Sequence, residues 1–241
     1  MFGFFNRPRV GADCLPTFVC LGAQKSGTTW LYEQLRQHPQ VRMPAIKELQ
    51  HFHPWHSDLA KYKEQFSPTR GHVSGDITPE YFVSPLAPEQ MAREVPKARL
   101  FAILRNPVER AFSQFRMALY LGNMKPDLPF EYYFEHDKGW IRSRGLYLEQ
   151  IERYRRFFPS PKQFRVFLYD DLLANPARFY RQICKYLGIS RHTPASVRQH
   201  LDMPYAGDGR QISPQIHHLL ANFYQEPNRE LQRYLGRPLP W

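Results

Sequence analysis

The chain has 241 residues, of which 42% are hydrophobic and 15% aromatic, so it can form one sizeable domain and is too apolar to be disordered. Its formal net charge of +11 suggests a polyanionic partner such as a nucleotide, nucleic acid, acidic glycan or membrane surface. The alternative is that the positive charge serves only to keep the protein soluble. Apolar runs are too short for a transmembrane helix, no secretory signal is visible, and the three cysteines lack metal-like spacing. We therefore expect a cytoplasmic protein without a transmembrane segment.

The first regular elements are a short strand and the helix that follows it. Residues Thr17–Gly22 form an apolar run that is typical of a buried strand. A helical pattern begins at Thr28 and continues to about Gln37, where Pro39 ends it. Strand, turn and helix in this order are the context in which a phosphate-binding loop is found.

The turn between them resembles a P-loop whose lysine has moved. Gly22 and Gly27 keep the glycine spacing of G-x-x-x-x-G-K-[ST], and Thr29 fills the hydroxyl position. Thr28 occupies the lysine position, whereas the only lysine, Lys25, comes two residues before the second glycine. A glycine turn that enters a helix presents backbone N–H groups to an anion, so we expect anion binding here rather than a tight turn with a solvated lysine.

Strands and helices alternate along the rest of the chain. Further strands are expected at Val73–Asp76, Arg99–Leu104 and Phe164–Tyr169. Helical patterns cover Glu89–Val95, Val108–Leu121, Leu146–Phe158, Pro176–Leu187 and Pro214–Leu235. The alternation predicts an α/β fold: a single P-loop-like domain with a central parallel sheet flanked by helices on both faces. Ligands of such sheets bind at the carboxyl ends of the strands.

A second candidate anion site follows the strand that ends at Leu104. Arg105 comes directly after this strand, and Asn106 and Pro107 form the turn into a helix. Ser113 lies eight residues after Arg105, about two helical turns further on. An arginine fork makes two hydrogen bonds to a phosphate, and a serine on the helix can donate a third. Pairing of Arg105 with a carboxylate remains the alternative.

Two kinds of donor fit these motifs. A nucleoside triphosphate needs Mg²⁺, which Asp170 or Asp171 at the end of a strand could hold, as in a P-loop kinase. A sulfuryl group bears less charge and can be transferred without a metal when a cation stands beside the leaving oxygen. The displaced Lys25 favours the sulfuryl donor.

Together these stretches resemble the sulfotransferases that use 3′-phosphoadenosine 5′-phosphosulfate (PAPS). The matching segments are AQKSGTTWL, KELQHF, GDITPEYF, LRNPVERAFSQF, YDDLLANP, GDGRQISPQ and YLGRPLPW. The resemblance implies PAPS as donor, adenosine 3′,5′-bisphosphate (PAP) as product and no metal, with Asp170 and Asp171 structural. It also implies that the phosphosulfate is bound by Gln24, Lys25, Ser26, Gly27, Thr28 and Thr29, and the 3′-phosphate by Arg105 and Ser113.

The branch that the chain most resembles is the carbohydrate branch, which includes the heparan sulfate sulfotransferases. There a glutamate acts as general base, and the matching residue is Glu48; pairing with Lys47 is its structural alternative. His51 stands where the family usually has an aromatic residue, so His51 and His53 are rival bases. Lys25 and Glu48, with His51 as the rival, are the predicted catalytic residues.

Three departures from the family pattern bear on the acceptor and the location. Ile77 stands where the glycan branch often has a lysine, which weakens the case for a polyanionic acceptor. Gly209 and Arg210 match a loop that closes over the nucleotide, but Asp208 replaces its lysine. The paired cysteines of luminal relatives are missing between Leu201 and Arg210, which fits a cytoplasmic enzyme.

The predicted activity is therefore in-line sulfuryl transfer from PAPS to an acceptor hydroxyl by one sulfotransferase domain, residues 1–241, with residues 1–16 as an N-terminal extension. The acceptor is a glycan, a glycolipid or a small molecule, and no nucleic acid is expected because no RNA-binding aromatic motif is present. The aromatic candidates for an acceptor cleft are Trp55, Tyr81, Phe82, Trp140 and Tyr147. A Mg-ATP-dependent kinase and a non-catalytic nucleotide-binding protein remain as alternatives.

Overall fold

The computed structural model of the chain describes residues 14–53, 58–67, 70–136, 140–192 and 211–241, and these contain a five-stranded sheet. The strands are β1 (Phe18–Gly22), β2 (Val41–Arg42), β3 (Val73–Ile77), β4 (Arg99–Leu104) and β5 (Phe164–Leu168). All neighbouring strands are parallel, in the order β2-β3-β1-β4-β5. The first long strand therefore lies at the centre, and the chain adds β3 on one side of it and β4 and β5 on the other.

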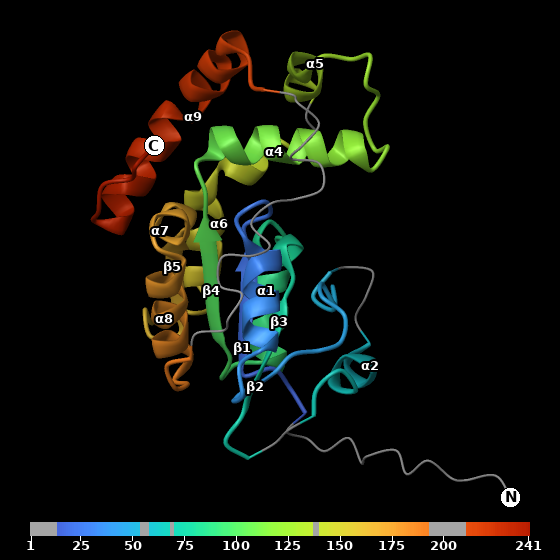
Figure 1. Ribbon diagram of the computed structural model, residues 1–241, viewed down its shortest axis with the longest axis vertical. Coiled ribbons are helices and arrows are strands. Elements are labelled where there is room, and N and C mark those ends of the chain that lie inside the picture. The colour runs from blue at the N-terminus through green and yellow to red at the C-terminus, as the bar shows by residue number, and fades with distance from the viewer. Residues whose placement is uncertain (1–13, 54–57, 68–69, 137–139, 193–210) are drawn as a thin grey trace, which may run out of the picture.

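Helices surround this sheet (Figure 1). They are α1 (Thr28–Arg36), α2 (Leu59–Lys63), α3 (Ala87–Glu94), α4 (Pro107–Tyr120), α5 (Phe130–Glu135), α6 (Tyr147–Arg155), α7 (Tyr169–Ala174), α8 (Pro176–Leu187) and α9 (Pro214–Leu235). Two 3₁₀ turns, η1 (Pro79–Phe82) and η2 (Ser143–Gly145), complete the described elements. Within the described residues, no helix is long and apolar enough to cross a bilayer.

Side chains of the central strands alternate between two buried faces of the sheet. Val19 and Leu21 point to one face, where they pack with residues of α3 and α6. Phe18 and Cys20 point to the other face, where they pack with residues of α1 and α8. Successive side chains of a strand point to opposite faces, so a strand that is apolar throughout must be covered on both. The predicted fold class, a parallel sheet with helices on both faces, is confirmed.

A third layer lies across the carboxyl ends of the strands. Figure 1 shows α4 crossing above the sheet, with α5 and α9 beyond it. These helices share their own apolar cluster, which includes Phe112, Phe115, Phe130 and Tyr224. Because this layer covers the sheet edge at which α/β proteins bind ligands, the space between α4 and the strand ends is the expected place for the site.

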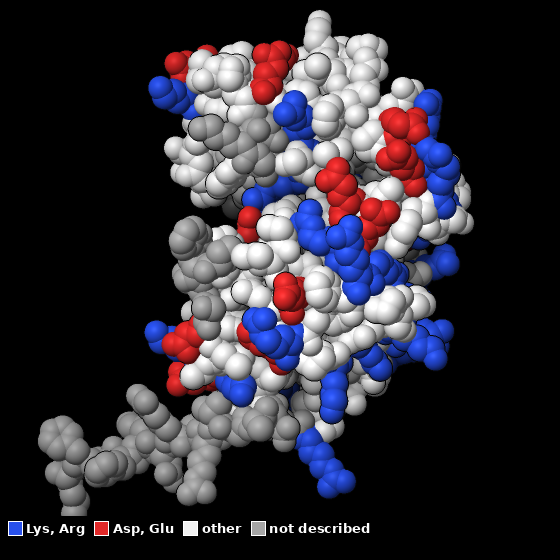
Figure 2. Space-filling view, turned by 180° about the vertical axis from the view of Figure 1, so that it is seen from behind, with Lys and Arg blue, Asp and Glu red and all other residues white. Residues whose placement is uncertain are grey.

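The positive charge of the chain is not concentrated on the face that Figure 2 shows. Lys and Arg side chains are spread over it, and Asp and Glu side chains lie among them. Much of this charge is therefore solvated surface, and the cations that are informative for function are those held inside the pocket described next.

Candidate functional site

The loop after β1 has the geometry of an anion-binding turn. β1 ends at Gly22, and α1 begins at Thr28. Gly27 precedes α1 with φ 80°, and a Cβ at this position would lie only 2.8 Å from a methyl carbon of Leu172 and 3.0 Å from the ring of Tyr169. Both the left-handed backbone and the close approach require glycine here. The predicted strand–loop–helix arrangement is confirmed.

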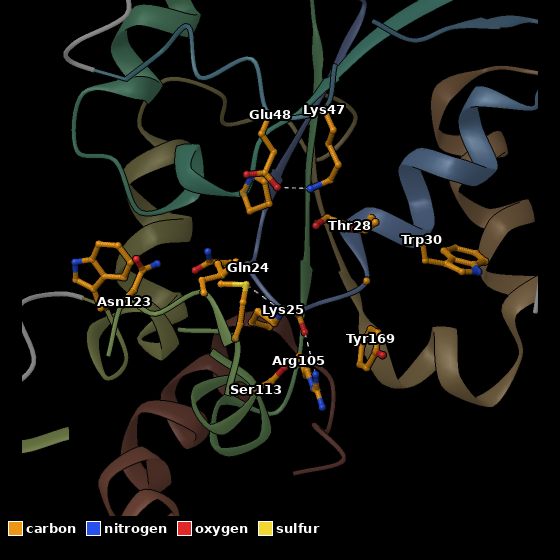
Figure 3. A pocket seen from close by; sticks show the side chains of 16 residues that line it. Gln24, Lys25, Thr28, Trp30, Lys47, Glu48, Arg105, Ser113, Asn123 and Tyr169 are labelled. Atoms are coloured by element: carbon orange, nitrogen blue, oxygen red, sulfur yellow. Dashed lines mark hydrogen bonds and ion pairs between the residues drawn. The ribbon is translucent and has the colours of Figure 1, made fainter. Parts of the chain in front are cut away.

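Lys25 extends from the middle of this loop into a pocket (Figure 3). Its backbone is left-handed, with φ 68°, and its carbonyl oxygen accepts a hydrogen bond of 3.1 Å from Nη1 of Arg105. Its Nζ lies 3.4 Å from the thioether sulfur of Met117, which is a weak acceptor. Burial, followed by the neighbouring charges of Arg105 and Lys47, lowers the pKa of Lys25 to about 7. An anion bound beside Lys25 would raise this pKa again, because it stabilises the charged ammonium.

Arg105 and Ser113 line the same pocket from the end of β4 and from α4. Asn106 caps α4 through its side chain, which accepts a hydrogen bond from the N–H of Val108, and this cap fixes the turn that carries Arg105. The guanidinium of Arg105 lies 3.7 Å from a carboxylate oxygen of Glu109, too far for a direct hydrogen bond. The guanidinium of Arg105 and the hydroxyl of Ser113, eight residues apart in the sequence, thus line the same pocket.

Glu48 lines the opposite side of the pocket, on an irregular segment between β2 and α2. Its φ is 65°, and its backbone N–H donates to the carbonyl of Ile77 at the end of β3, at 3.2 Å. Its carboxylate forms an ion pair with the ammonium of Lys47, which also lines the pocket. Lys25 and Glu48 are thus both non-glycine residues with left-handed backbone, a strained conformation that is frequent at functional sites.

A buried cluster anchors the segment that carries Glu48. Asp76 accepts hydrogen bonds from the hydroxyls of Tyr62 at 3.0 Å, Tyr81 at 2.9 Å and Thr78 at 2.7 Å. Phe52, four residues after Glu48, packs against both tyrosine rings, with centroid separations of 5.4 and 5.3 Å. The Glu48 segment is therefore fixed from β3, α2 and η1, although it has no regular structure itself.

The structure does not bring His51 into the pocket. His51 is only 5% exposed, and its ring stacks on that of Tyr62 with the ring centres 4.2 Å apart. Its Nε2 atom lies 2.7 Å from a carboxylate oxygen of Glu94. A histidine whose face and nitrogen are occupied in this way is placed to pack α2 and α3 against the Glu48 segment, and it does not face an acceptor. His53 is also absent from the residues that line the pocket.

The predicted nucleotide residues largely converge on this pocket of about 450 Å³. Gln24, Lys25, Gly27, Thr28, Thr29, Arg105 and Ser113 all line it. Ser26 lies in the same loop but is fully buried behind it. Gly209 and Arg210, with Asp208, lie outside the described residues, as does Trp55. Among the other aromatic candidates, Tyr81, Phe82 and Tyr147 are core residues, and only Trp140 lines the pocket.

Sequence reasoning missed two features of the site. Met117 lines the pocket one turn after Ser113, and the helical spacing from Ser113 could have indicated this. Arg144 makes two hydrogen bonds to the carboxylate of Glu80, at 2.8 and 2.7 Å, and a third to the amide oxygen of Gln24 at 3.2 Å. No local sequence signal connects these three residues, because Gln24 and Arg144 are 120 positions apart.

Asp170 and Asp171 occur in the first turn of α7 and face the C-terminal segment of the chain. The indole N–H of Trp241 donates to Asp170 at 2.9 Å, and Arg237 lies 3.6 Å from Asp171. Neither aspartate lines the pocket. These contacts favour the structural role over a magnesium site.

Comparisons with known proteins agree with this geometry. The family model described as "Sulfotransferase domain" matches residues 15–208. A membrane-associated sulfotransferase, kil1, of Dictyostelium discoideum is 22% identical over 95% of this chain and 67% of its own length. Mouse heparan sulfate glucosamine 3-O-sulfotransferase 3B1 is 28% identical over 96% of this chain and 66% of its own length. Human heparan sulfate glucosamine 3-O-sulfotransferase 6 is 32% identical over 75% of this chain and 54% of its own length. The chain thus spans about two thirds or less of these curated relatives.

Solved structures show the same fold. A sulfotransferase from Alicyclobacillus acidocaldarius superposes with a TM-score of 0.79 at 25% identity, covering 93% of this chain and 97% of that one. Mouse sulfotransferase SULT7A1, crystallised with PAP, superposes with a TM-score of 0.61 at 14% identity, covering 93% and 91%. The second likeness concerns the fold alone.

Proposed function

The chain belongs to the sulfotransferase domain family, and from this premise we propose that it transfers the sulfuryl group of PAPS to an acceptor hydroxyl by in-line transfer. The observation that carries the proposal is the convergence of Lys25, Arg105, Ser113 and Glu48 on one pocket at the carboxyl ends of the strands. The first three suit an anionic donor, and the last suits an acceptor that must lose a proton.

The residues of the pocket fit an anionic nucleotide. The cation of Lys25 is destabilised by burial beside Arg105 and contacts a thioether, and the 3.7 Å ion pair of Arg105 with Glu109 is too long for a direct hydrogen bond. Both cations therefore gain from an anion that hydrogen-bonds them directly. We assign the 3′-phosphate to Arg105 and Ser113, and the 5′-phosphosulfate to the loop from Gln24 to Thr29. PAPS supplies a sulfuryl group activated by its anhydride bond to phosphate.

Glu48 is the proposed general base. An alcohol is a weak nucleophile unless its proton leaves in the transition state, and a positioned base contributes about 10²–10⁴-fold. The carboxylate of Glu48 faces the pocket, and its ion pair with Lys47 orients it. The pairing that was the structural alternative for Glu48 is thus compatible with the catalytic role.

Lys25 is the proposed electrophilic partner. Its ammonium donates a hydrogen bond to the bridging oxygen on which negative charge grows as the sulfuryl group departs. Because its carbonyl is held by Arg105 and its backbone is left-handed, the side chain is directed across the loop toward the pocket. A cation fixed before the reaction costs little reorganisation in the transition state.

The two alternative functions gain no support from the site. A kinase would use an acidic residue near the loop hydroxyls to hold magnesium, whereas Asp170 and Asp171 contact Trp241 and Arg237. A non-catalytic nucleotide-binding protein would have no use for a carboxylate facing the loop lysine. Gly209 and Arg210 remain predicted contacts to the nucleotide.

The proposal is tested by binding and transfer. Isothermal titration calorimetry should show PAP binding without magnesium, and label from PAPS carrying a radioactive sulfate should appear on an acceptor from a panel of glycans, glycolipids, alcohols and phenols. A chelator should leave transfer unchanged. Binding of ATP–magnesium without measurable PAP binding would overturn the proposal.

The cellular location of the protein is tested separately from its activity. The relatives include a protein named as membrane-associated, so the cytoplasmic location stays a prediction that rests on the sequence pattern alone. Fractionation of the cells that make the protein checks it: recovery with membranes that resist a salt wash would contradict the prediction.

A further inference from the structure

The pocket has two walls of different chemistry. Lys25, Arg105 and Ser113 belong to the wall that we assign to the nucleotide. The other wall consists of Met117, Leu121, Asn123 and Trp140, next to Gln24. In Figure 3, Asn123 and Gln24 lie on one side of Lys25, Thr28 and Tyr169 on the other, and Glu48 above them. The second wall thus lines the same pocket as Lys25 and the proposed base.

Among the described residues, this second wall is largely apolar and carries no charged side chain. Leu121 is 57% exposed and Trp140 is 49% exposed, although both are large hydrophobic residues at the rim of a pocket. The polar groups of this wall are the neutral amides of Gln24 and Asn123. An exposed aromatic ring beside neutral amides is suited to a ring-shaped compound that carries hydroxyl groups.

Trp140 is held in place from behind by a buried arginine. The guanidinium of Arg144 lies 5.6 Å from the centre of the indole ring. Arg144 is only 7% exposed and is bound by the carboxylate of Glu80 through two hydrogen bonds. Its charge is therefore used inside the protein: it supports Trp140 and fixes Gln24, and it is not directed at an acceptor.

Among the described residues, the pocket offers little positive charge to a polyanionic acceptor. Of the three described cations that line the pocket, Lys25 and Arg105 face the donor, and Lys47 is paired with Glu48. Ile77, at the end of β3, is apolar and buried, so it adds no charge to the side of the pocket that carries Glu48. Sulfate or carboxylate groups of an acceptor would thus lie near Glu48 without a compensating cation among the described lining residues.

We propose that the acceptor is an uncharged hydroxyl compound whose flat ring face, that of a neutral sugar or a phenol, packs on Trp140. This inference rests on the proposed function and deepens it. Stacking on the indole orients the ring, the amide of Asn123 binds its other hydroxyls, and the reacting hydroxyl faces Glu48. A bond forms between the acceptor oxygen and sulfur as the bond between sulfur and the bridging oxygen of PAPS breaks. PAP leaves, and the acceptor proton passes to Glu48.

The experiment compares three acceptors with PAPS as donor: 4-nitrophenyl β-galactoside, 2-naphthol and a heparan sulfate oligosaccharide. We expect transfer to at least one uncharged acceptor, with kcat/KM at least tenfold above that of the oligosaccharide. Trp140→Ala should raise the KM of the uncharged acceptor about tenfold and leave PAP affinity unchanged, whereas Trp140→Phe should stay within about threefold. Phe157→Ala removes an exposed aromatic residue elsewhere and serves as the matched control.

The outcomes separate this inference from the proposed function. If PAP does not bind, the proposed function fails. If PAP binds but the oligosaccharide is the better acceptor, or none of the three accepts sulfate, only the inference about the acceptor fails. An unchanged KM in Trp140→Ala, with a melting temperature equal to that of the parent protein, would also overturn it.

Discussion

The two walls of the pocket are built in different ways. Most of the donor wall comes from residues directly after strands: the loop follows β1 and Arg105 follows β4, while Ser113 is added from α4. The acceptor wall is made from the end of a helix and from irregular segments: Met117 lies in the last turn of α4, Leu121 and Asn123 lie beyond it, and Trp140 lies before η2. A rigid sheet edge can present phosphate-binding groups to the same donor in many proteins, whereas loops can change without loss of the fold. The difference suggests that the fold determines the specificity for the donor, whereas the loops that connect its elements determine the specificity for the acceptor.

The largest effect is expected from Glu48, which lies between the two walls. Glu48→Gln should lower kcat about 10³-fold because the acceptor proton loses its base, while PAP affinity stays within about threefold. Steady-state kinetics measures the change in kcat, and calorimetry measures the affinity for PAP. Glu89→Gln, on the exposed side of α3, is the control. A near-parental kcat in the Glu48→Gln variant would remove the base from the mechanism.

Lys25 tests the donor wall directly. Lys25→Ala should lower turnover a few hundredfold, which is the usual effect of removing one group that stabilises growing charge. Lys185→Ala, an exposed lysine of α8, should have no effect. Single-turnover measurements at saturating PAPS separate this loss from weaker binding, and a turnover close to that of the parent protein would contradict the role of Lys25.

Arg105 sharpens the assignment of the 3′-phosphate. Arg105→Ala should weaken PAP binding about 10–100-fold, because hydrogen bonds to a charged group are lost, but should change the affinity for AMP, which has no 3′-phosphate, less than threefold. Arg105→Lys should restore only part of the loss, since lysine lacks the fork. Calorimetry with both nucleotides provides the measurement, and Arg178→Ala on the exposed face of α8 is the control. Equal losses for PAP and AMP would place the 3′-phosphate elsewhere.

The smallest effect is a dependence of binding on pH. Burial lowers the pKa of Lys25 to about 7, so the ammonium is present below pH 7 and increasingly absent above it in the ligand-free protein. Binding an anion above pH 7 then requires the uptake of a proton, and PAP affinity should fall by up to about tenfold per pH unit. Lys25→Met should flatten this profile between about pH 7 and 9. A profile of the same slope in both proteins would assign the titration to another group.

Much of the sheet was readable from the sequence because its signals are local. The strand at Arg99–Leu104 and the helices at Pro176–Leu187 and Pro214–Leu235 have the predicted bounds. The short elements α2, α5 and α7, with the two-residue strand β2, were not predicted, since a pattern of two to six residues is too brief to show a period. The layer formed by α4, α5 and α9 also depends on packing between distant segments.

By itself, the sequence determined the parallel α/β fold and the donor loop, because apolar runs, helical periods, glycine positions and the residues that follow a strand are properties of nearby residues. The tertiary structure alone decided three further points. It buried His51 between Tyr62 and Glu94, brought Glu48 to the pocket that Lys25 lines, and placed Trp140 on Arg144 at the rim of that pocket. The acceptor wall joins segments that are distant along the chain, namely the end of α4, Trp140 and the neighbouring Gln24, and such long-range proximity leaves no periodic trace in one sequence.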